Sequence, residues 1–222
     1  MSISENIQSI QTDIAKISAE HDCDAAKVHL VAVSKKQSGS RIQEALDAGH
    51  RLFGENRVQE AQDHWGARRD QYPDLKLHLI GPLQTNKVKD AVALFDVIET
   101  LDREKLARKL SAEMKEQGKD LPCFIQVNTG EEDQKSGIIP KDLPEFLNYS
   151  IKECGLNVTG LMCIPPLDDP PAAHFAFLRK LAQEHGLEQL SMGMSGDYKQ
   201  AIPLGASYIR VGTGVFGERD YA

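Results

Sequence analysis

Eight short apolar segments recur along the chain, and polar and apolar residues do not clearly alternate within them. A strand of this composition is covered on both faces, which is the situation of strands in a parallel sheet. Stretches with helical spacing of their apolar residues lie between the segments, so strands and helices are predicted to alternate. The apolar segments are residues 29–34, 51–54, 76–81, 97–101, 123–128, 158–164, 187–194 and 207–211.

Helix signals flank these segments. Ser40 and Gln43 form a capping-box pattern, and Gly49 is a typical stop for the helix that would begin there. A leading amphipathic helix is indicated by isoleucines on one helical face, namely Ile3, Ile7, Ile10, Ile14 and Ile17. Later helices are expected over 57–71 and 83–95, before Gly118, and after Pro140, Pro144 and Pro171.

This alternation favours a closed barrel. Eight strands and their helices over about 200 residues match the compact end of the barrel size range. We therefore expect an α/β protein, a single (β/α)8 TIM barrel with an extra N-terminal helix, which occupies residues 1–222 as one domain. An open doubly wound sheet would show the same alternation, and periodicity alone leaves that alternative open.

The composition excludes some classes of partner. Hydrophobic residues make up 41% of the chain, which is enough for a conventional core. The formal charge of −7 provides no broad field for nucleic acid or anionic lipid. No segment approaches the ~20 apolar residues of a membrane span, and the N-terminus lacks the form of a signal peptide. We expect a cytoplasmic monomer with no nucleic-acid or membrane partner.

Candidate binding residues lie where the predicted strands end, because ligands collect at the carboxyl ends of strands in both layouts. Lys35 brings an amine to that edge. Glycine-rich turns follow the last two segments, at Gly193-Met-Ser-Gly-Asp197 and Val211-Gly-Thr-Gly214. Backbone N–H groups there, with the hydroxyls of Ser195 and Thr213, suit a phosphate. Together these groups favour a small anionic carbonyl compound that is held covalently as an imine.

Each candidate also has an ordinary structural explanation. The glycines serve tight turns, and Lys35 is either a functional amine or a surface charge such as its neighbour Lys36. Asn56 is either a ligand of the site or the N-cap of the helix that follows it. Arg210 lies inside the last apolar segment, where a buried guanidinium either pairs with a core carboxylate or points at a ligand.

No other catalytic pattern stands out. His29 and His78 are interpreted as structural imidazoles, and there is no Ser-His-Asp order or nucleotide-binding fingerprint. The cysteines show no metal-type spacing, so we expect free thiols in a reducing compartment and no metal site. They are Cys23, Cys123, Cys154 and Cys163.

Seven motifs follow one another along nearly the whole chain. They are Val31-Ala-Val-Ser-Lys35, Phe53-Gly-Glu-Asn-Arg-Val-Gln-Glu60, His78-Leu-Ile-Gly-Pro-Leu-Gln-Thr-Asn-Lys87, Lys135-Ser-Gly-Ile138, Gly160-Leu-Met162, Leu190-Ser-Met-Gly-Met-Ser195 and Ile209-Arg-Val-Gly-Thr213. Together they closely resemble the pyridoxal phosphate homeostasis protein family. Seven motifs in order are far more specific than any one of them.

The resemblance implies a fold similar to the N-terminal barrel domain of alanine racemase, with pyridoxal 5'-phosphate (PLP) as cofactor. One motif departs from the family, which often reads Ser-Lys-Thr-Lys-Pro where this chain has Ser34-Lys-Lys-Gln-Ser38. That difference concerns the shape of the first loop and leaves the lysine in place. The resemblance assigns Lys35 as the Schiff-base lysine, Arg210 beside the pyridine nitrogen, Ser195, Gly212 and Thr213 at the phosphate, and Asn56 near the cofactor.

The expected function follows from this resemblance and from the chemistry of arginine. An arginine does not readily donate its proton to the pyridine nitrogen, so the ring stays unprotonated and is a weak electron sink. The family and this chemistry favour a non-enzymatic protein of intracellular PLP (vitamin B6) homeostasis, which buffers PLP or delivers it to PLP-dependent apo-enzymes.

Two enzyme classes are the alternatives. A PLP-dependent amino-acid racemase needs an acid/base group on each face of the substrate carbon. Resemblance to alanine racemase would ask for a tyrosine from a C-terminal domain, whereas this chain stops at Ala222. A Schiff-base aldolase acting on a sugar phosphate would share the lysine and the phosphate loops.

Overall fold

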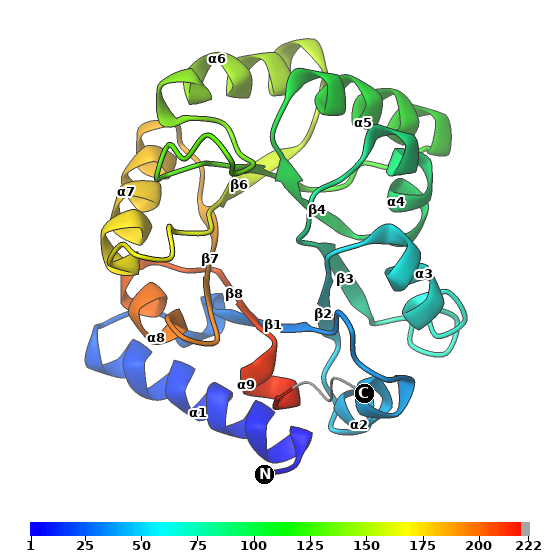
Figure 1. Ribbon diagram of the computed structural model, residues 1–222, viewed down its shortest axis with the longest axis vertical. Coiled ribbons are helices and arrows are strands. Elements are labelled where there is room, and N and C mark those ends of the chain that lie inside the picture. Colours follow the sequence, from blue (N-terminus) through cyan, green and yellow to red (C-terminus); the bar gives the residue numbers. More distant parts are fainter. Residues whose placement is uncertain (219–222) are drawn as a thin grey trace.

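A closed barrel of parallel strands forms the centre of the protein (Figure 1). The computed structural model describes residues 1–218, and within them eight strands follow one another around the barrel in sequence order. The first strand pairs in parallel with both the second and the last. The predicted (β/α)8 barrel is therefore confirmed, and the open doubly wound sheet is excluded. Residues 219–222 of the predicted domain lie outside the described residues.

The strands agree with the predicted apolar segments to within a few residues. Some predicted segments end too late, because apolar residues such as Ile80 and Ile164 continue past the strand and line the mouth of the barrel. The strands are β1 (His29–Val33), β2 (Leu52–Glu55), β3 (Lys76–Leu79), β4 (Val97–Leu101), β5 (Cys123–Gln126), β6 (Val158–Met162), β7 (Gln189–Met194) and β8 (Tyr208–Val211).

Helices surround the barrel (Figure 1). They are α1 (Ile3–Glu20), α2 (Gly39–Asp47), α3 (Val58–Trp65), α4 (Val88–Leu94), α5 (Glu104–Gln117), α6 (Leu143–Asn148), α7 (Pro171–Glu184), α8 (Tyr198–Ala201) and α9 (Thr213–Phe216). Single turns of 3-10 helix are η1 (Ala25–Lys27), η2 (Thr85–Lys87), η3 (Pro140–Asp142) and η5 (Ile202–Leu204), and a π-helical turn, η4 (Tyr149–Glu153), continues α6. Through residue 218, no helix combines the length and apolarity that crossing a bilayer requires.

Three predicted helix starts are wrong, and one of them is residue 83, because α4 begins only at Val88 after the turn η2. Ser38, and not Ser40, caps α2, because the Ser38 hydroxyl accepts the N–H of Arg41 at 3.4 Å. Asn56 does not cap α3, which begins at Val58 and has no side-chain cap. The predicted stop at Gly118 is confirmed, since α5 ends there with a left-handed φ of 63°.

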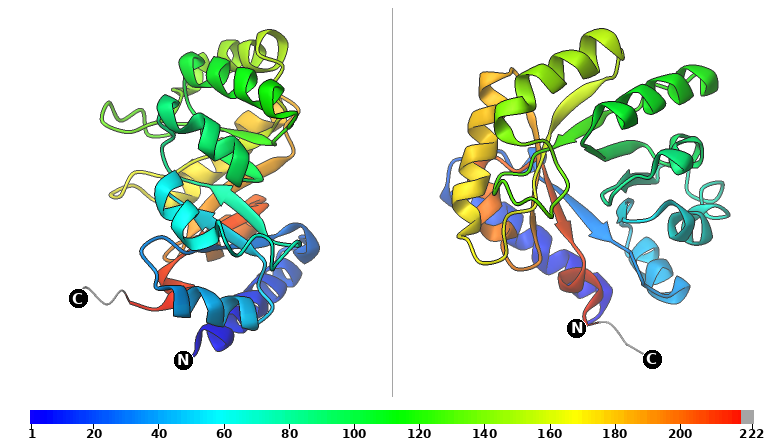
Figure 2. Two further views of the ribbon diagram at one scale, coloured as in Figure 1. Left: turned by 90° about the vertical axis from the view of Figure 1, so that its right-hand side faces the viewer. Right: turned by 45° about the horizontal axis from the view of Figure 1, so that its top comes forward.

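The leading helix α1 packs beside the C-terminal part of the barrel. Figure 2 shows it running alongside α9, and the Asn6 amide donates a hydrogen bond to the Val215 carbonyl of α9 at 2.9 Å. Tyr198 of α8 donates from its hydroxyl to Asp13 at 2.6 Å. The predicted apolar face is buried through Ile3, Ile7, Ile10 and Ile14. The helix thus ties the beginning of the chain to its last two helices.

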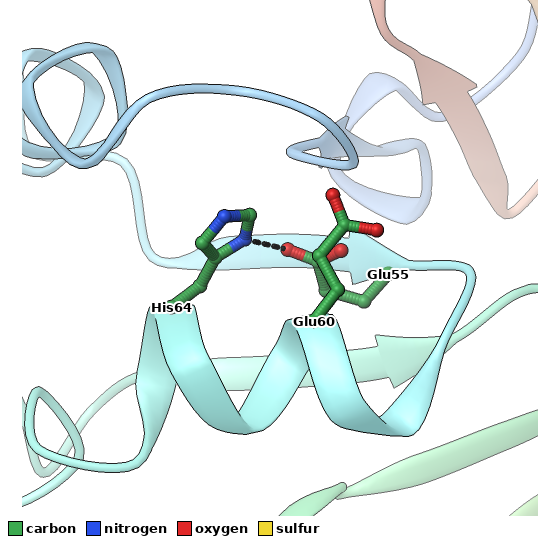
Figure 3. A group of neighbouring side chains, drawn as sticks. All are labelled: Glu55, Glu60 and His64. Atoms are coloured by element: carbon green, nitrogen blue, oxygen red, sulfur yellow. Dashed lines mark hydrogen bonds and ion pairs between the residues drawn. The ribbon is translucent and has the colours of Figure 1, made fainter.

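Glu55, the last residue of β2, is a fully buried carboxylate that joins β1 and α3 (Figure 3). Its Oε1 accepts hydrogen bonds from the Ser34 hydroxyl at 2.7 Å, from His64 Nδ1 at 2.8 Å and from Trp65 Nε1 at 3.1 Å. The hydrogen bond to Glu55 is the largest cause that raises the pKa of His64. Because Ser34 precedes Lys35, this carboxylate also supports the loop that carries the lysine.

We predict that His64→Gln destabilises the protein mainly in acidic solution. Since the pKa of His64 is raised, its ion pair contributes fully below the unfolded value of about 6.5 and is lost as pH rises through the folded value. The variant should lose about 1 to 2 kcal/mol near pH 5.5 and less near pH 9. Urea unfolding at both pH values measures this, with exposed His21→Gln as control. A loss that grows with pH would contradict the assignment.

Candidate functional site

A cavity of about 260 Å³ opens at the carboxyl ends of β1, β2, β7 and β8. Apolar side chains form part of its wall, including Ile80 and Met194. The structure brings to this cavity every residue that the sequence indicated for the cofactor, although these residues follow or end four different strands. They are Lys35, Asn56, Ser195, Arg210, Gly212 and Thr213.

Lys35 lies two residues after the end of β1 and is partly buried in the cavity wall, whereas the next residue, Lys36, is exposed. The residues on both sides of Lys35 are held by carboxylates. Ser34 donates its hydroxyl to Glu55 at 2.7 Å, and the backbone N–H of Lys36 donates to Glu60. The loop that departs from the family motif is therefore anchored on each side of the lysine.

The two glycine-rich turns meet at the edge of the cavity. The N–H of Gly214 donates to the Ser195 hydroxyl at 3.2 Å, which joins the turn after β8 to the turn after β7. A Cβ added at Gly196 would meet no atom within 4 Å, so open space lies beside this turn. A Cβ added at Gly214 would come within 2.6 Å of a side-chain atom of β8, so this position requires glycine. The turns thus leave room for a ligand next to the Ser195 and Thr213 hydroxyls.

Asn56 lines the cavity and has one side-chain atom without a hydrogen-bond partner. Its Oδ1 is buried and makes no hydrogen bond within residues 1–218. A Cβ added at Gly81 would lie 2.3 Å from the Asn56 carbonyl oxygen, so glycine at 81 allows the two loops to touch. A buried polar atom without a partner is costly, so the binding of a ligand group by Asn56 stays a prediction with this atom in its support.

Arg210 of β8 is buried and lines the floor of the cavity. Its Nη1 donates to the Ser191 hydroxyl at 2.6 Å, and its Nη2 donates to the Cys163 carbonyl at 2.8 Å. Ser191 in turn donates to the fully buried carboxylate of Glu99 at 2.6 Å. Arg210 thus reaches the core carboxylate of Glu99 only through Ser191, with no ion pair to it among the described residues, and its contact with a ligand stays a prediction.

Sequence reasoning missed Glu99. The residue stands in the middle of the apolar run Val97-Ile-Glu-Thr-Leu101, where a charged residue is unusual. A charged residue within an apolar segment could have marked Glu99 as unusual. The sequence does not show, however, that its side chain points into the barrel toward β7. His78, expected as a structural imidazole, contacts the same carboxylate.

Glu55, Glu60 and His64 lie close enough together to hold a metal ion (Figure 3). Each offers one ligand atom, and these atoms lie within 4.8 Å of one another. All three side chains already bond to protein groups, however, and the raised pKa of His64 favours an imidazolium beside Glu55. We interpret the group as hydrogen-bonded support of the lysine loop, and the expected lack of a metal stays a prediction.

A larger cavity, about 600 Å³, lies at the opposite end of the barrel, where His29, Gln189 and Tyr208 begin their strands. Ligand sites of parallel barrels occur at the carboxyl ends of the strands. The smaller cavity combines a strand-end amine, a buried guanidinium and two glycine-rich turns. It is therefore the candidate site despite its smaller volume.

The cysteines take no part in this cavity. All four are free, and three of them are buried. Burial raises the pKa of Cys123 and of Cys163 to about 12, so both remain thiols at neutral pH. The prediction of free thiols is confirmed.

Comparison with known proteins identifies the relatives of the chain. The family model of the alanine racemase N-terminal domain matches residues 6–220. The pyridoxal phosphate homeostasis protein of Vibrio cholerae is 42% identical, over 100% of this chain and 98% of that protein. The protein of the same name from Escherichia coli K12 is 34% identical, over 99% of this chain and 98% of its own length.

Solved structures agree with these relatives. PipY of Synechococcus elongatus, in a structure with PLP bound, is 36% identical with a TM-score of 0.83, over 97% of this chain and 100% of that chain. An alanine racemase of Clostridium difficile is 13% identical with a TM-score of 0.71, over 97% of this chain and 57% of that chain, and shows the fold alone. The chain thus belongs to the pyridoxal phosphate homeostasis protein family and has the barrel fold of the alanine racemase N-terminal domain.

Proposed function

We propose that the protein binds PLP in the cavity at the carboxyl ends of the strands and serves intracellular PLP (vitamin B6) homeostasis. It holds PLP as a Schiff base on Lys35 and buffers the cofactor or delivers it. The observation that carries the proposal is that the Lys35 amine, the Arg210 guanidinium and both glycine-rich turns line one cavity. The names of the relatives and the PLP bound to PipY support it.

The residues of the cavity fit the chemical groups of PLP. When bound, PLP supplies an aldehyde that condenses with an amine and releases water. Lys35 would provide the amine, and the turns that contain Ser195, Gly212 and Thr213 would provide hydrogen-bond donors for the phosphate. Arg210 would meet the ring nitrogen, and the unused Oδ1 side of Asn56 would face the remaining polar groups.

The same residues favour a carrier over an enzyme. Arg210 carries its own charge permanently and does not readily pass a proton to the ring nitrogen, which leaves the ring a weak electron sink. A racemase also needs a second acid/base group opposite Lys35. The described lining of the cavity contains no tyrosine, histidine or carboxylate, which supports a protein without substantial turnover.

The remaining features of the proposal concern partners and location. We propose that the protein acts in the cytoplasm as a monomeric single barrel domain and passes PLP to PLP-dependent apo-enzymes. Its acidic balance, with a formal charge of −7, supports the expectation that it has no nucleic-acid or membrane partner.

We predict that borohydride treatment of the PLP-loaded protein fixes one pyridoxyl group on Lys35. Peptide mapping identifies the labelled residue. Lys35→Ala should abolish the labelling and leave the protein folded, because truncating a strand-end side chain opens no large cavity in the core. Lys36→Ala, the matched control, should be labelled like the parent. A label on Lys36, or none after incubation with PLP, would refute the Schiff base on Lys35.

We predict that the phosphate supplies much of the affinity. Several charge-assisted hydrogen bonds, each about 1.5 to 3 kcal/mol, would converge on it. The double variant Ser195→Ala/Thr213→Val should therefore bind PLP at least about tenfold more weakly, and pyridoxal without phosphate should bind far more weakly to the parent. Titrations measure both effects. The control Ser9→Ala/Thr12→Val changes the same residue types on α1; equal affinities for the two double variants would count against this placement.

We predict that the loaded protein transfers PLP without catalysing amino-acid chemistry. The measurement follows the chirality of L-alanine and other amino acids and the formation of keto acids, in parallel with activation of a PLP-dependent apo-enzyme. Turnover at about 1 to 1,000 per second that is lost in Lys35→Ala would contradict the carrier function and favour a racemase or another enzyme. Activation of the apo-enzyme without such turnover is the expected result.

A further inference from the structure

A chain of hydrogen bonds crosses the inside of the barrel. His78 Nδ1 pairs with Glu99 Oε1 at 2.6 Å, and the Ser191 hydroxyl donates to Glu99 Oε2 at 2.6 Å. Arg210 Nη1 donates to the same Ser191 oxygen at 2.6 Å. These residues come from β3, β4, β7 and β8, and none is more than 4% exposed. Because β4 and β7 are not neighbours in the barrel, the bond between Glu99 and Ser191 spans the interior.

Aromatic rings surround the His78 end of this series of hydrogen bonds. The Tyr208 ring lies 5.0 Å from the His78 ring and 5.7 Å from the Phe124 ring, centre to centre. These residues stand on β8, β3 and β5, so their contacts also lie inside the barrel. A charge placed there is removed from water and is tolerated only when it is paired and hydrogen-bonded.

Glu99 carries a negative charge in this interior. Burial alone raises the pKa of its carboxyl group. The hydrogen bond and the charge of His78, the charge of Arg210 and the hydrogen bond from Ser191 outweigh burial, so the pKa lies below its ordinary value. Both oxygens of the carboxylate are used, one by His78 and the other by Ser191.

The other end of this series of hydrogen bonds, at Arg210, reaches the candidate cavity. Arg210 lines the cavity, and its Nη2 is held by the Cys163 carbonyl at 2.8 Å. With Nη1 bound to Ser191, both terminal nitrogens are anchored in the core. The remaining nitrogen, Nε, has no hydrogen-bond partner in the described part of the chain. The guanidinium therefore enters the site in one defined orientation.

We infer that Glu99 is a positioning residue of the cofactor site, which acts through Ser191 to orient Arg210 and supplies the buried negative charge that balances it. The inference rests on the proposed function, because it concerns the arginine that would meet the ring nitrogen of PLP. Ser191 transmits the orientation, and Glu99 is the negative charge that offsets the positive charges of Arg210 and His78 below the cofactor. The field at the Schiff-base nitrogen of Lys35 then depends on a residue that does not line the cavity.

The charge is tested with Glu99→Gln, which keeps the shape of the side chain and removes its charge. Arg210 would then face the cavity without its balancing anion, and a more positive site makes the Schiff-base nitrogen harder to protonate. The pH midpoint of the visible absorption change of the PLP-loaded variant should fall by at least about 0.5 pH unit. Glu113→Gln is the matched control, since Glu113 is only 3% exposed but lies on α5 outside the barrel.

The orientation is tested with Ser191→Ala, which breaks the link and keeps the Glu99 charge. PLP affinity should fall at least about fivefold, while the midpoint stays within about 0.2 pH unit of the parent. An unchanged midpoint in Glu99→Gln overturns the inference. Should Glu99→Gln not fold by circular dichroism, Ser191→Ala decides: weakened binding supports the link through Ser191, and parental affinity overturns it.

Borohydride labelling of the parent separates this inference from the proposed function. A parent that does not label on Lys35 overturns both. The other outcome is a parent that labels on Lys35 while Glu99→Gln and Ser191→Ala show the same absorption midpoint and PLP affinity as Glu113→Gln. That outcome overturns the role of Glu99 but leaves the proposed function intact.

Discussion

Without the backbone hydrogen bonds between β1 and β8, neither the site nor the interior of the barrel would form. These bonds align His29 with Tyr208 and Ala32 with Val211, and they close the sheet into a barrel. The alignment sets Lys35, just beyond β1, at the same edge as the turn of Gly212 that follows β8. Closure also creates the enclosed interior in which Glu99 and Ser191 meet from opposite sides.

That interior differs from the usual barrel core of branched apolar side chains. A carboxylate, a guanidinium and an imidazole share it, and burying them is costly unless each is paired. Their hydrogen bonds run toward the carboxyl ends of the strands and end at Arg210. Paired polar groups thus lie next to Arg210, which lines the cavity, and by our inference they set the charge and the orientation of this part of its wall.

The same barrel serves enzymes and this family, so the fold does not decide between catalysis and transport of a cofactor. The difference lies in which groups surround the cavity. An amine and hydrogen-bond donors are sufficient to hold PLP, whereas carbanion chemistry also needs a proton donor at the ring nitrogen and a second acid/base group. Under the proposed function, the Lys35 amine and the donors of the glycine-rich turns meet the first set of requirements, and Arg210, fixed by core partners, does not readily supply the proton donor of the second.

Local sequence patterns were enough to predict the alternation of strands and helices, the leading helix and the candidates Lys35, Ser195 and Thr213. Buried strands, helix faces and strand-end glycines all leave such patterns. The sequence did not determine the cap of α2, since Ser38 and Ser40 carry the same signal two residues apart. The closure of the barrel, the position of Asn56 at the cavity and the link from Glu99 through Ser191 to Arg210 became visible only in the folded structure. These features depend on contacts between residues far apart in the chain, 92 positions in the case of Glu99 and Ser191, and local sequence patterns do not encode such contacts.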